Sequence, residues 1–568
     1  MREILYKNFY GGIAESLRDE SNFKFDFAKH FDIWSDPKKL IPQKTIVANN
    51  NGFTAGSSGN RPANFMILNG QTSSDCVMLG KIASGVNNMP KLYLNSDSNA
   101  DWLALTNAES TLNSLFTKML IKYKTKYYGR NGQRIFSYAP ATTTWVDDAS
   151  GGTLLLSNSN DTKTNAIIGK SNGYLYFPTA NLLHYFDGST WGTALLSIPS
   201  DENIIGLANY GSYLAVLTDA SFIYLWDFAS ILATEIIELP EGSYSNLGSS
   251  EGQLIAIGQK VTPTGSELLI SQYGGGNAEV IFRKNLPDTV SVVQGIARSR
   301  YGKVFFAVND SATDRKYQGI WCIGRHKAGF PMAVSIAFDY LESGGTASDI
   351  ANFDIDFQHL YVVTIDYKIH KLSTTFAITA PISQVEFCRS LADDANMNAI
   401  SVGSAYLPAD GVVTTKIQKD EETLWTEVMK DSTDNSLGMQ TDRVNQSAKT
   451  ATITIATPGV VTCVNHGFGK NQAFKFSTTG ALPTGITAGT IYYVSSTSLT
   501  TDTFKFATSP NGTVINTTGS QSGVHTITTE PATLPSFSEV AVRVESLGGG
   551  EITEVKFKVT DNDTIYDG

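Results

Sequence analysis

The sequence predicts an all-β protein: a β-propeller of six or seven blades, followed by a β-sandwich domain with an inserted small β-domain. Three observations predict this fold. Short segments rich in Val, Ile, Tyr and Phe alternate with Gly, Asn, Asp and Ser, which is the pattern of strands joined by turns. One strand motif returns after about 40 residues, as propeller blades do. Beyond residue 390 the pattern changes, and two similar strand-rich stretches flank a segment of different composition.

The composition supports a folded chain and excludes several other classes of protein. Of the 568 residues, 11% are aromatic and only 17% are charged. The chain therefore has enough apolar area for a large core and is neither disordered nor a coiled coil. The sequence contains no apolar run of roughly 18 residues, so we expect no membrane span. The first residues, MREILYKNFYGG, lack the apolar stretch of a signal peptide.

The net charge limits which partners are expected, and the cysteines indicate the redox compartment in which the protein is made. The formal net charge of −11 argues against bulk wrapping of nucleic acid, although a local basic patch remains compatible with it. The cysteines are far apart in the sequence and form no CxxC motif, so we expect small core residues made in a reducing cell. The four cysteines are Cys76, Cys322, Cys388 and Cys463.

The first element is an N-terminal arm of residues 1–45, in which aromatic residues alternate with charged ones. Phe23, Phe25 and Phe27 alternate with period two, which is typical of a strand with one buried face. We expect the arm to pair with the propeller or with a neighbouring subunit. Alternatively, it closes the propeller ring as an outer strand. The candidate assembly residues are Phe23, Phe25, Phe27, Phe31 and Trp34.

The second element, residues 46–390, contains the repeat. In five copies a glycine precedes an alternating apolar strand, and consecutive glycines are 41, 38, 41 and 50 residues apart. A single blade cannot bury both of its faces, so neighbouring blades must stack around an axis. A large β-sandwich is the alternative. The five glycines are Gly132, Gly173, Gly211, Gly252 and Gly302; MPKLYL around Tyr93 and FQHLYVVT around Tyr361 extend the series.

Only residues 102–122 have helical apolar spacing, and we expect a short helix or a turn there.

A basic segment lies within the propeller region. Six Lys and Arg residues fall within 17 positions, no acidic residue occurs between positions 117 and 146, and tyrosines lie among the basic residues. Such a segment suits a surface that faces DNA, a polysaccharide or an acidic neighbouring subunit. A solvated strand face is the alternative. The candidate residues are Lys118, Lys122, Lys124, Lys126, Arg130 and Arg134.

The third and fourth elements are a sandwich and its insertion. We expect residues 391–446 and 531–568 to form one β-sandwich, and residues 447–530 to form a separate small domain. The inserted segment is rich in Thr, Ser and Gly and almost free of charge. Residues 537–559 alternate between apolar and polar positions on both sides of a glycine run, which predicts a hairpin closed by that turn.

Catalytic and metal-binding patterns are incomplete. Residues 185–191, YFDGSTW, depart from a sialidase Asp-box because Gly follows Asp directly, which predicts a tight turn. Glycoside hydrolysis needs two acids that face each other. Asp354 and Asp356 are candidates because alternation places both on one strand face, but a polar strand face is the simpler interpretation. His359 and His370 lie on expected neighbouring strands, yet none of the seven histidines shows metal-ligand spacing. We expect no enzymatic activity and no cofactor or metal.

Four short motifs mark the inserted segment: HG at 466–467, TGALP at 479–483, GITAGTIYY at 485–493 and DTF at 502–504. With these motifs, roughly 70 residues resemble a small β-module common in tail and fibre proteins of tailed phages. The N-terminal sequence NFYGGIAESLRDESNFKFDFAKHFDIWSDPKKLIP looks like the opening of phage tail structural proteins that carry a propeller after an arm. Nozzle and tail-tip proteins of short-tailed phages share this plan.

These resemblances imply a structural component of a virion and no catalytic residue. They imply a tail tube, nozzle or tail-tip protein that assembles as an oligomeric ring, expected to be a hexamer, and is made in the host cytoplasm. Its partners would be copies of itself, neighbouring tail proteins, and either phage DNA during ejection or a host receptor. A receptor-binding or tail-fibre protein is the alternative, and a glycan-degrading propeller enzyme is the remoter one.

Overall fold

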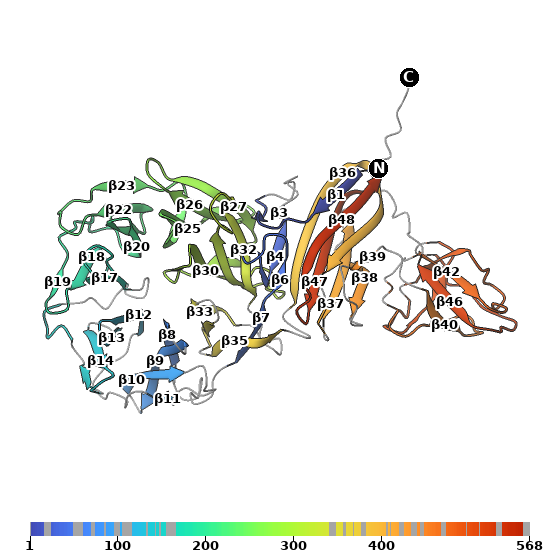
Figure 1. The fold of residues 1–568 in the computed structure, drawn as a ribbon, viewed down its shortest axis with the longest axis horizontal. Helices are drawn as coiled ribbons and strands as arrows, with labels where there is room; N and C mark the ends of the chain where they lie inside the picture. Colours follow the sequence, from blue (N-terminus) through green and yellow to red (C-terminus); the bar gives the residue numbers. More distant parts are fainter. Residues whose placement is uncertain are drawn as a thin grey trace, which may run out of the picture. The chain divides into compact units, whose positions relative to one another are not determined.

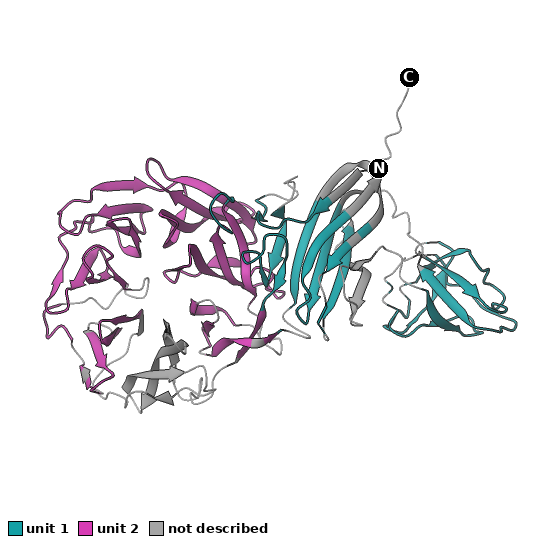
Figure 2. Cartoon of the chain, viewed as in Figure 1, with its two compact units in different colours: residues 1–43, 326–331, 376–568 teal, residues 44–325, 332–375 magenta. Residues whose placement is uncertain are grey.

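The computed structural model describes most of the chain as strands and turns. Among these residues there is no helix of the length and apolarity that a membrane crossing requires. The chain divides into two compact units, residues 1–43, 326–331 and 376–568, and residues 44–325 and 332–375 (Figure 2). The described residues are 2–15, 24–48, 61–69, 74–84, 87–95, 103–104, 116–131, 134–142, 144–146, 149–154, 166–339, 348–355, 359–366, 368–376, 382–404, 407–408, 411–419, 425–432, 440–442, 448–466, 468, 473–495, 497–509, 512–529 and 537–560.

The second unit is built from antiparallel sheets that follow one another along the chain (Figure 1). The sheets are β8–β11 (Arg61–Asn69, Ser74–Ser84, Asn87–Asn95, Leu103–Ala104), β12–β15 (Phe116–Tyr123, Lys126–Asn131, Arg134–Ala139, Thr144–Val146), β16–β19 (Ile167–Ile168, Leu175–Thr179, Leu182–Phe186, Trp191–Thr193), β20–β23 (Ile204–Tyr210, Tyr213–Thr218, Phe222–Trp226, Glu235–Glu238), β24–β27 (Ser243–Ser250, Gln253–Thr262, Gly265–Tyr273, Glu279–Leu286), β28–β32 (Val290–Val292, Arg298–Arg300, Lys303–Asp310, Gly319–Gly324, Ala333–Asp339), and β33–β35 with β7 (Ile350–Ile355, Leu360–Thr364, Ile369–Phe376, Lys44–Ala48).

The inner strands of successive sheets contact each other and close a ring. Strand β20 packs against β24, β24 against β29, and β29 against β33. Strand β8 contacts both β12 and β33, so the first sheet lies between the second and the last. Sheets stacked in this way around one axis form a β-propeller. The described strands supply seven blades, at the upper end of the predicted six or seven.

Ring closure depends on a strand from the N-terminal part of the chain. Strand β7 lies beside β35 as the outermost strand of the seventh blade. The Ile46 side chain is 1% exposed, and Thr45 Oγ1 donates a hydrogen bond to the main-chain oxygen of Thr375 over 3.2 Å. Of the predicted arm, only residues 44–45 belong to this outer strand, so the strand crosses the predicted boundary between arm and propeller at residue 46.

Three of the repeated glycines, Gly211, Gly252 and Gly302, lie in tight hairpins that lead into an interior strand of their sheet. Ser250 pairs with Gln253, so Glu251 and Gly252 alone form the turn, with φ of 48° and 78°. Tyr301-Gly302 forms the same kind of turn, with φ of 53° and 72°. Positive φ at both positions defines a type I′ turn, whose twist matches that of the flanking strands. The sequence repeat thus reflects a repeated backbone requirement.

The strands of the repeat do not all occupy the same position in their blades. MPKLYL is part of β10 and the strand after Gly132 is β14, which are third strands, whereas the strands after Gly211 and Gly252 are second strands. Any antiparallel hairpin can use a glycine turn, so the spacing alone did not identify which hairpin it closed. The expected helix or turn at residues 102–122 is wrong where the structure describes it, because residues 103–104 and 116–122 are in strands β11 and β12.

The C-terminal strands of the first unit form two sheets that share one long strand. The first half of β36 (Ser383–Ser404) pairs with β47 (Phe537–Leu547), and its second half pairs with β48 (Ile552–Thr560). The predicted hairpin of residues 537–559 therefore has the right strands but the wrong pairing. The remaining strands of the two sheets are β1 (Arg2–Tyr6), β4 (Phe27–Lys29), β37 (Val412–Lys419), β38 (Thr426–Ser432) and β39 (Gln440–Asp442).

The inserted segment forms a small, nearly closed β-barrel. Its strand order is β44-β41-β40-β46-β42-β43-β45. The two end strands are separated in the chain by Lys505 alone, so the sheet must curl until its edges nearly meet. Aromatic and aliphatic side chains fill its interior. The strands are β40 (Lys449–Ile453), β41 (Val461–Thr462), β42 (Ala473–Thr478), β43 (Ile491–Val494), β44 (Thr503–Phe504), β45 (Phe506–Ala507) and β46 (His525–Thr529).

Candidate functional site

The predicted assembly arm is built into the sheets of the first unit. Strand β3 (Lys24–Phe25) pairs in parallel with β2 (Gly12–Ile13), β4 pairs with β36, and β5 (Phe31–Asp32) pairs with β6 (Ile41–Pro42). The main-chain nitrogen of Asp26 donates to the oxygen of Glu386 over 2.9 Å. The arm thus forms hydrogen bonds to its own chain along most of its described length.

The aromatic side chains of the arm are buried. Phe25, Phe27 and Phe31 are at most 3% exposed, and Trp34 is 9% exposed. Phe23 lies outside the described residues. Their apolar area is already covered by the chain itself, so these side chains offer no surface to a neighbouring subunit in this structure.

The basic segment is divided between solvent and core. Lys122, Lys124 and Lys126 are exposed around the hairpin that joins β12 to β13. Arg130 is 2% exposed, and its Nη1 donates to Thr179 Oγ1 over 3.2 Å. Lys118 and Arg134 lie on β12 and β14, and their side chains lie outside the description. The three described lysines can meet a polyanion, whereas Arg130 is a packing residue between the second and third blades.

The expected turn after β18 is present. Asp187 Oδ1 accepts hydrogen bonds from the main-chain nitrogens of Ser189 and Thr190, each over 2.6 Å. The Trp191 ring stacks on Phe186, with 4.1 Å between ring centroids. This confirms a tight turn that ends in a packed tryptophan.

The two histidines singled out by the sequence are not opposite each other. His370 on β35 pairs with Val362 on β34, whereas His359 precedes β34. Burial lowers the pKa of His370 to about 4, so it stays neutral near pH 7. Among the residues that the structure describes, no group of three or more His, Cys, Asp or Glu side chains is placed to hold a metal ion.

The inner strands of the propeller enclose a cavity of about 440 Å³. Its described lining comes from the second to the seventh blades and includes the apolar side chains Ile121, Leu207 and Leu247. This volume is within the range of roughly 300–1,000 Å³ that small-molecule sites occupy. The charged residues of the described lining are Arg298, Arg300 and Asp354.

Asp354 belongs to an ion-pair cluster and not to a pair of acids. Its Oδ1 atom lies 3.4 Å from Arg298 Nε and 3.6 Å from Arg300 Nη2. Asp356, its expected partner, lies outside the described residues. The sequence did carry a signal for the cluster, because two arginines two positions apart on the first strand of a blade share one strand face.

Arg298 is held rigidly from several directions. Its Nη1 donates to the main-chain oxygen of Ile296 over 3.1 Å, and its Nη2 donates to Asn352 Oδ1 over 3.4 Å. Its guanidinium lies 5.9 Å from the centre of the Phe353 ring. Burial lowers the pKa of Arg298 below its usual value, an effect opposed by the nearby Asp354 carboxylate.

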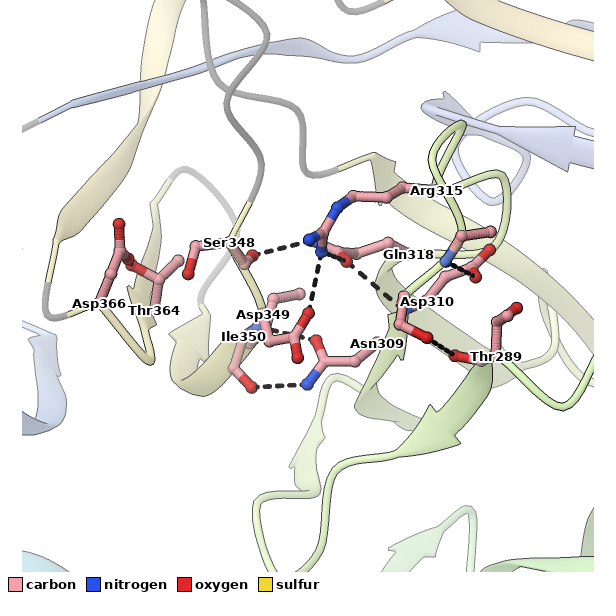
Figure 3. Close-up of polar contacts among 12 residues, drawn as sticks. Thr289, Asn309, Asp310, Arg315, Gln318, Ser348, Asp349, Ile350, Thr364 and Asp366 are labelled. Carbon is pink, nitrogen blue, oxygen red and sulfur yellow. Dashed lines mark hydrogen bonds and ion pairs between the residues drawn. The ribbon is translucent and has the colours of Figure 1, made fainter.

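A second polar cluster joins the sixth and seventh blades (Figure 3). Asn309 Nδ2 donates to the main-chain oxygen of Ile350 over 3.0 Å, and its Oδ1 accepts from the nitrogen of Ile350 over 2.7 Å. Arg315 Nη1 lies 2.9 Å from Asp349 Oδ1. These contacts link the end of β30 and the following loop to the start of β33. We therefore interpret this cluster as a clamp between blades.

An exposed apolar patch lies on the outer side of the third and fourth blades. We call it the perimeter patch: Leu195, Ile231, Leu232 and Ile236, which are 58–72% exposed. The main-chain nitrogen of Ser197 donates to the oxygen of Ile231 over 2.8 Å and brings its two segments together. Ile236 pairs with Tyr224, whose side chain packs between these two blades, so Ile236 lies on the same side. The sequence alone does not reveal this patch, because apolar residues near a strand normally predict burial.

The chain was compared with known proteins. No family model and no curated protein matches it. Solved structures that match include YCF48 bound to D1 peptide, with 12% identity and a TM-score of 0.39, covering 59% of this chain and 96% of that chain. BamB from Moraxella catarrhalis matches with 13% identity and a TM-score of 0.36, over 59% of this chain and 93% of that chain. The propeller assignment given above depends on the strand pairing and not on these distant similarities.

Proposed function

We propose that this protein is a structural component of a tailed-phage virion, a tail tube, nozzle or tail-tip protein that assembles as a ring of identical copies. The observation that carries the assembly part of the proposal is the perimeter patch. Contiguous exposed apolar side chains on a soluble protein mark interaction sites. The virion context rests on the resemblance of residues 447–530 and of the N-terminal segment to phage tail proteins.

The edge of the fourth blade favours a head-to-tail contact over a two-fold dimer. Strand β23 is the last strand of its sheet, with Glu235 and Glu238 at its ends. If β23 paired antiparallel with its own copy, Glu235 would lie opposite Glu238, and like charges in that position are destabilising. A different surface of the neighbouring copy avoids this repulsion, and such heterologous contacts generate rings.

DNA would pass through the lumen of the subunit ring and not through the propeller. A cavity of about 440 Å³ accommodates a small molecule. A DNA duplex, whose major groove alone is about 12 Å wide, is far larger. The exposed lysines of the β12–β13 hairpin are the residues of the basic segment that could face DNA or a neighbouring tail protein.

The proposal is tested by measuring the mass in solution by light scattering, together with the copy number in phage particles. We expect a six-membered ring, and we expect the double variant Leu232→Asp/Ile236→Lys to release monomers. Val261→Asp is the matched control, because Val261 is 87% exposed on another hairpin. Three copies per particle, or a monomer that binds host cells, would favour a receptor-binding protein. Absence from every particle would overturn both.

A further inference from the structure

We propose that the central cavity of the propeller binds a small organic anion, whose carboxylate or phosphate group is held by Arg300. This inference goes beyond the proposed structural function and does not depend on it. It follows from the charge of the cavity, the unequal exposure of its three charged side chains and the character of its remaining lining.

The described lining of the cavity carries more positive than negative charge. Its described charged residues are two arginines and one aspartate, and both guanidinium groups approach the same oxygen of Asp354. The three described charged side chains thus have a formal sum of one positive charge. An anion that enters the cavity balances this charge.

Arg300 is the arginine that can reach a ligand. Its side chain is 42% exposed, against 8% for Arg298 and 3% for Asp354. Arg300 Nη1 donates to the main-chain oxygen of Ser299 over 3.1 Å, and its Nη2 lies a loose 3.6 Å from Asp354 Oδ1. The guanidinium fork can bind a carboxylate or a phosphate through two parallel hydrogen bonds. Arg298 and Asp354 thus form the fixed support, and Arg300 is the ligand-binding group.

The rest of the described lining is mixed, with both apolar and polar residues. Ile121, Leu207 and Leu247 line the cavity. The amide of Asn209, also in the lining, is already engaged, since its Nδ2 donates to the oxygen of Ile168 over 2.9 Å and its Oδ1 accepts from the nitrogen of Lys170 over 3.0 Å. A small organic anion, with an apolar part that can contact the three apolar side chains, matches this mixed lining.

Calorimetric titration of the full-length protein at fixed ionic strength tests the inference, with benzoate, inorganic phosphate and neutral benzamide as probes. We expect saturable binding of benzoate, weaker binding of phosphate and no binding of benzamide. Stronger binding of phosphate than of benzoate would instead identify a phosphate ligand. We expect Arg300→Gln to weaken anion binding by about tenfold or more, as the loss of a charge-assisted hydrogen-bond pair does. The matched control is Arg283→Gln, a 49% exposed arginine on the outer strand of the fifth blade, which should bind as the parent does.

A gain-of-affinity variant distinguishes ligand binding from a merely structural role of the cluster. Asp354→Asn removes the only acid of the described lining, so anion binding should become severalfold tighter at the same ionic strength. Near-UV circular dichroism would verify that the variant is folded. Unchanged affinity in Arg300→Gln, or the absence of saturable binding by both anions, would overturn the inference. Weaker anion binding in a folded Asp354→Asn variant would also overturn it.

Discussion

Three buried histidines are the residues through which we expect mild acid to destabilise this protein. Burial lowers the pKa of His30 to about 3 and those of His184 and His370 to about 4. Arg130, close to His184, lowers the pKa of that histidine further. In the unfolded chain each imidazole binds a proton near its ordinary pKa of about 6.5. Between pH 6.5 and pH 4 the unfolded state therefore binds protons that the folded state does not.

We predict that the free energy of unfolding falls as the pH is lowered from 6.5 to 4, because stability decreases with falling pH wherever the unfolded state binds more protons. His184→Gln should reduce this slope while the protein stays folded at pH 7.5. Denaturant unfolding at several pH values measures the slope. Carboxylates with a lowered pKa, such as Asp227 at about 2, reduce stability only below about pH 5, so the slope between pH 6.5 and 5 reports the histidines. An identical slope in the variant would contradict the assignment of His184.

For single residues, the sequence predicted which side chains are buried better than it predicted what those side chains contact. The alternation of Phe25 and Phe27 indicated one buried face, but Asp26 and Ala28 on the other face are buried too, so both faces of this segment are covered. It did not identify the surface that covers them, since the partner strand β36 lies more than 350 positions away.

In the basic segment, too, the sequence did not predict which side chains are buried. Arg130 and Lys126 look alike in a charge count, but only the blade interface separates the buried residue from the exposed one.

The blade is the element that the sequence specifies most clearly. Its hairpins demand positive φ at fixed positions, and glycine adopts such a conformation at the lowest cost. Where a non-glycine residue occupies such a position, as Glu251 does with φ of 48°, the strain is left in the fold. The pairing of long-range strands has no comparable local signal, which is why β47 and β48 were predicted to pair with each other.

The hairpin of the fifth blade allows a test with two opposite outcomes. Gly252→Ala should destabilise the propeller by about 1–2 kcal/mol, because an L residue at φ of 78° meets its own carbonyl. Glu251→Gly should leave stability unchanged or raise it by up to about 1 kcal/mol, since it relieves strain at the neighbouring position while loosening the unfolded chain. Equilibrium unfolding of both variants measures these changes. Destabilisation of equal size in both would show that the turn is not strained as described.

At the scale of the whole molecule, the N-terminal chain serves both compact units. Strand β1 pairs with β48 in the first unit, and β7 completes the seventh blade of the second. The first unit is therefore assembled from both ends of the chain, with the propeller between them in the sequence. The composition of the chain predicted the boundary near residue 390. It did not predict that the N-terminal strands join both units, because the sequence of an edge strand does not indicate which strand it pairs with.

The inserted barrel is the part of the molecule whose independence can be predicted from the geometry. Lys449 at the start of β40 pairs with Ile527 near the end of β46, so the two ends of the insertion lie side by side. Its aromatic interior is made by its own residues, with Phe474 and Phe476 at most 1% exposed. A segment with adjacent ends and its own core can be removed without unfolding the domain into which it is inserted.

We predict that replacing residues 448–529 by a short Gly-Ser linker leaves the rest of the chain folded, and that the excised segment folds alone. Phe474→Ala should then destabilise the excised barrel by about 3–5 kcal/mol, as the loss of a buried phenylalanine does. The same substitution in the full-length protein should lower the midpoint of the barrel transition and leave the propeller transition in place. Scanning calorimetry of all these proteins resolves the transitions. A single shared transition that shifts as a whole would show that the barrel and its host unfold cooperatively, contrary to the interpretation of residues 447–530 as an autonomous insertion.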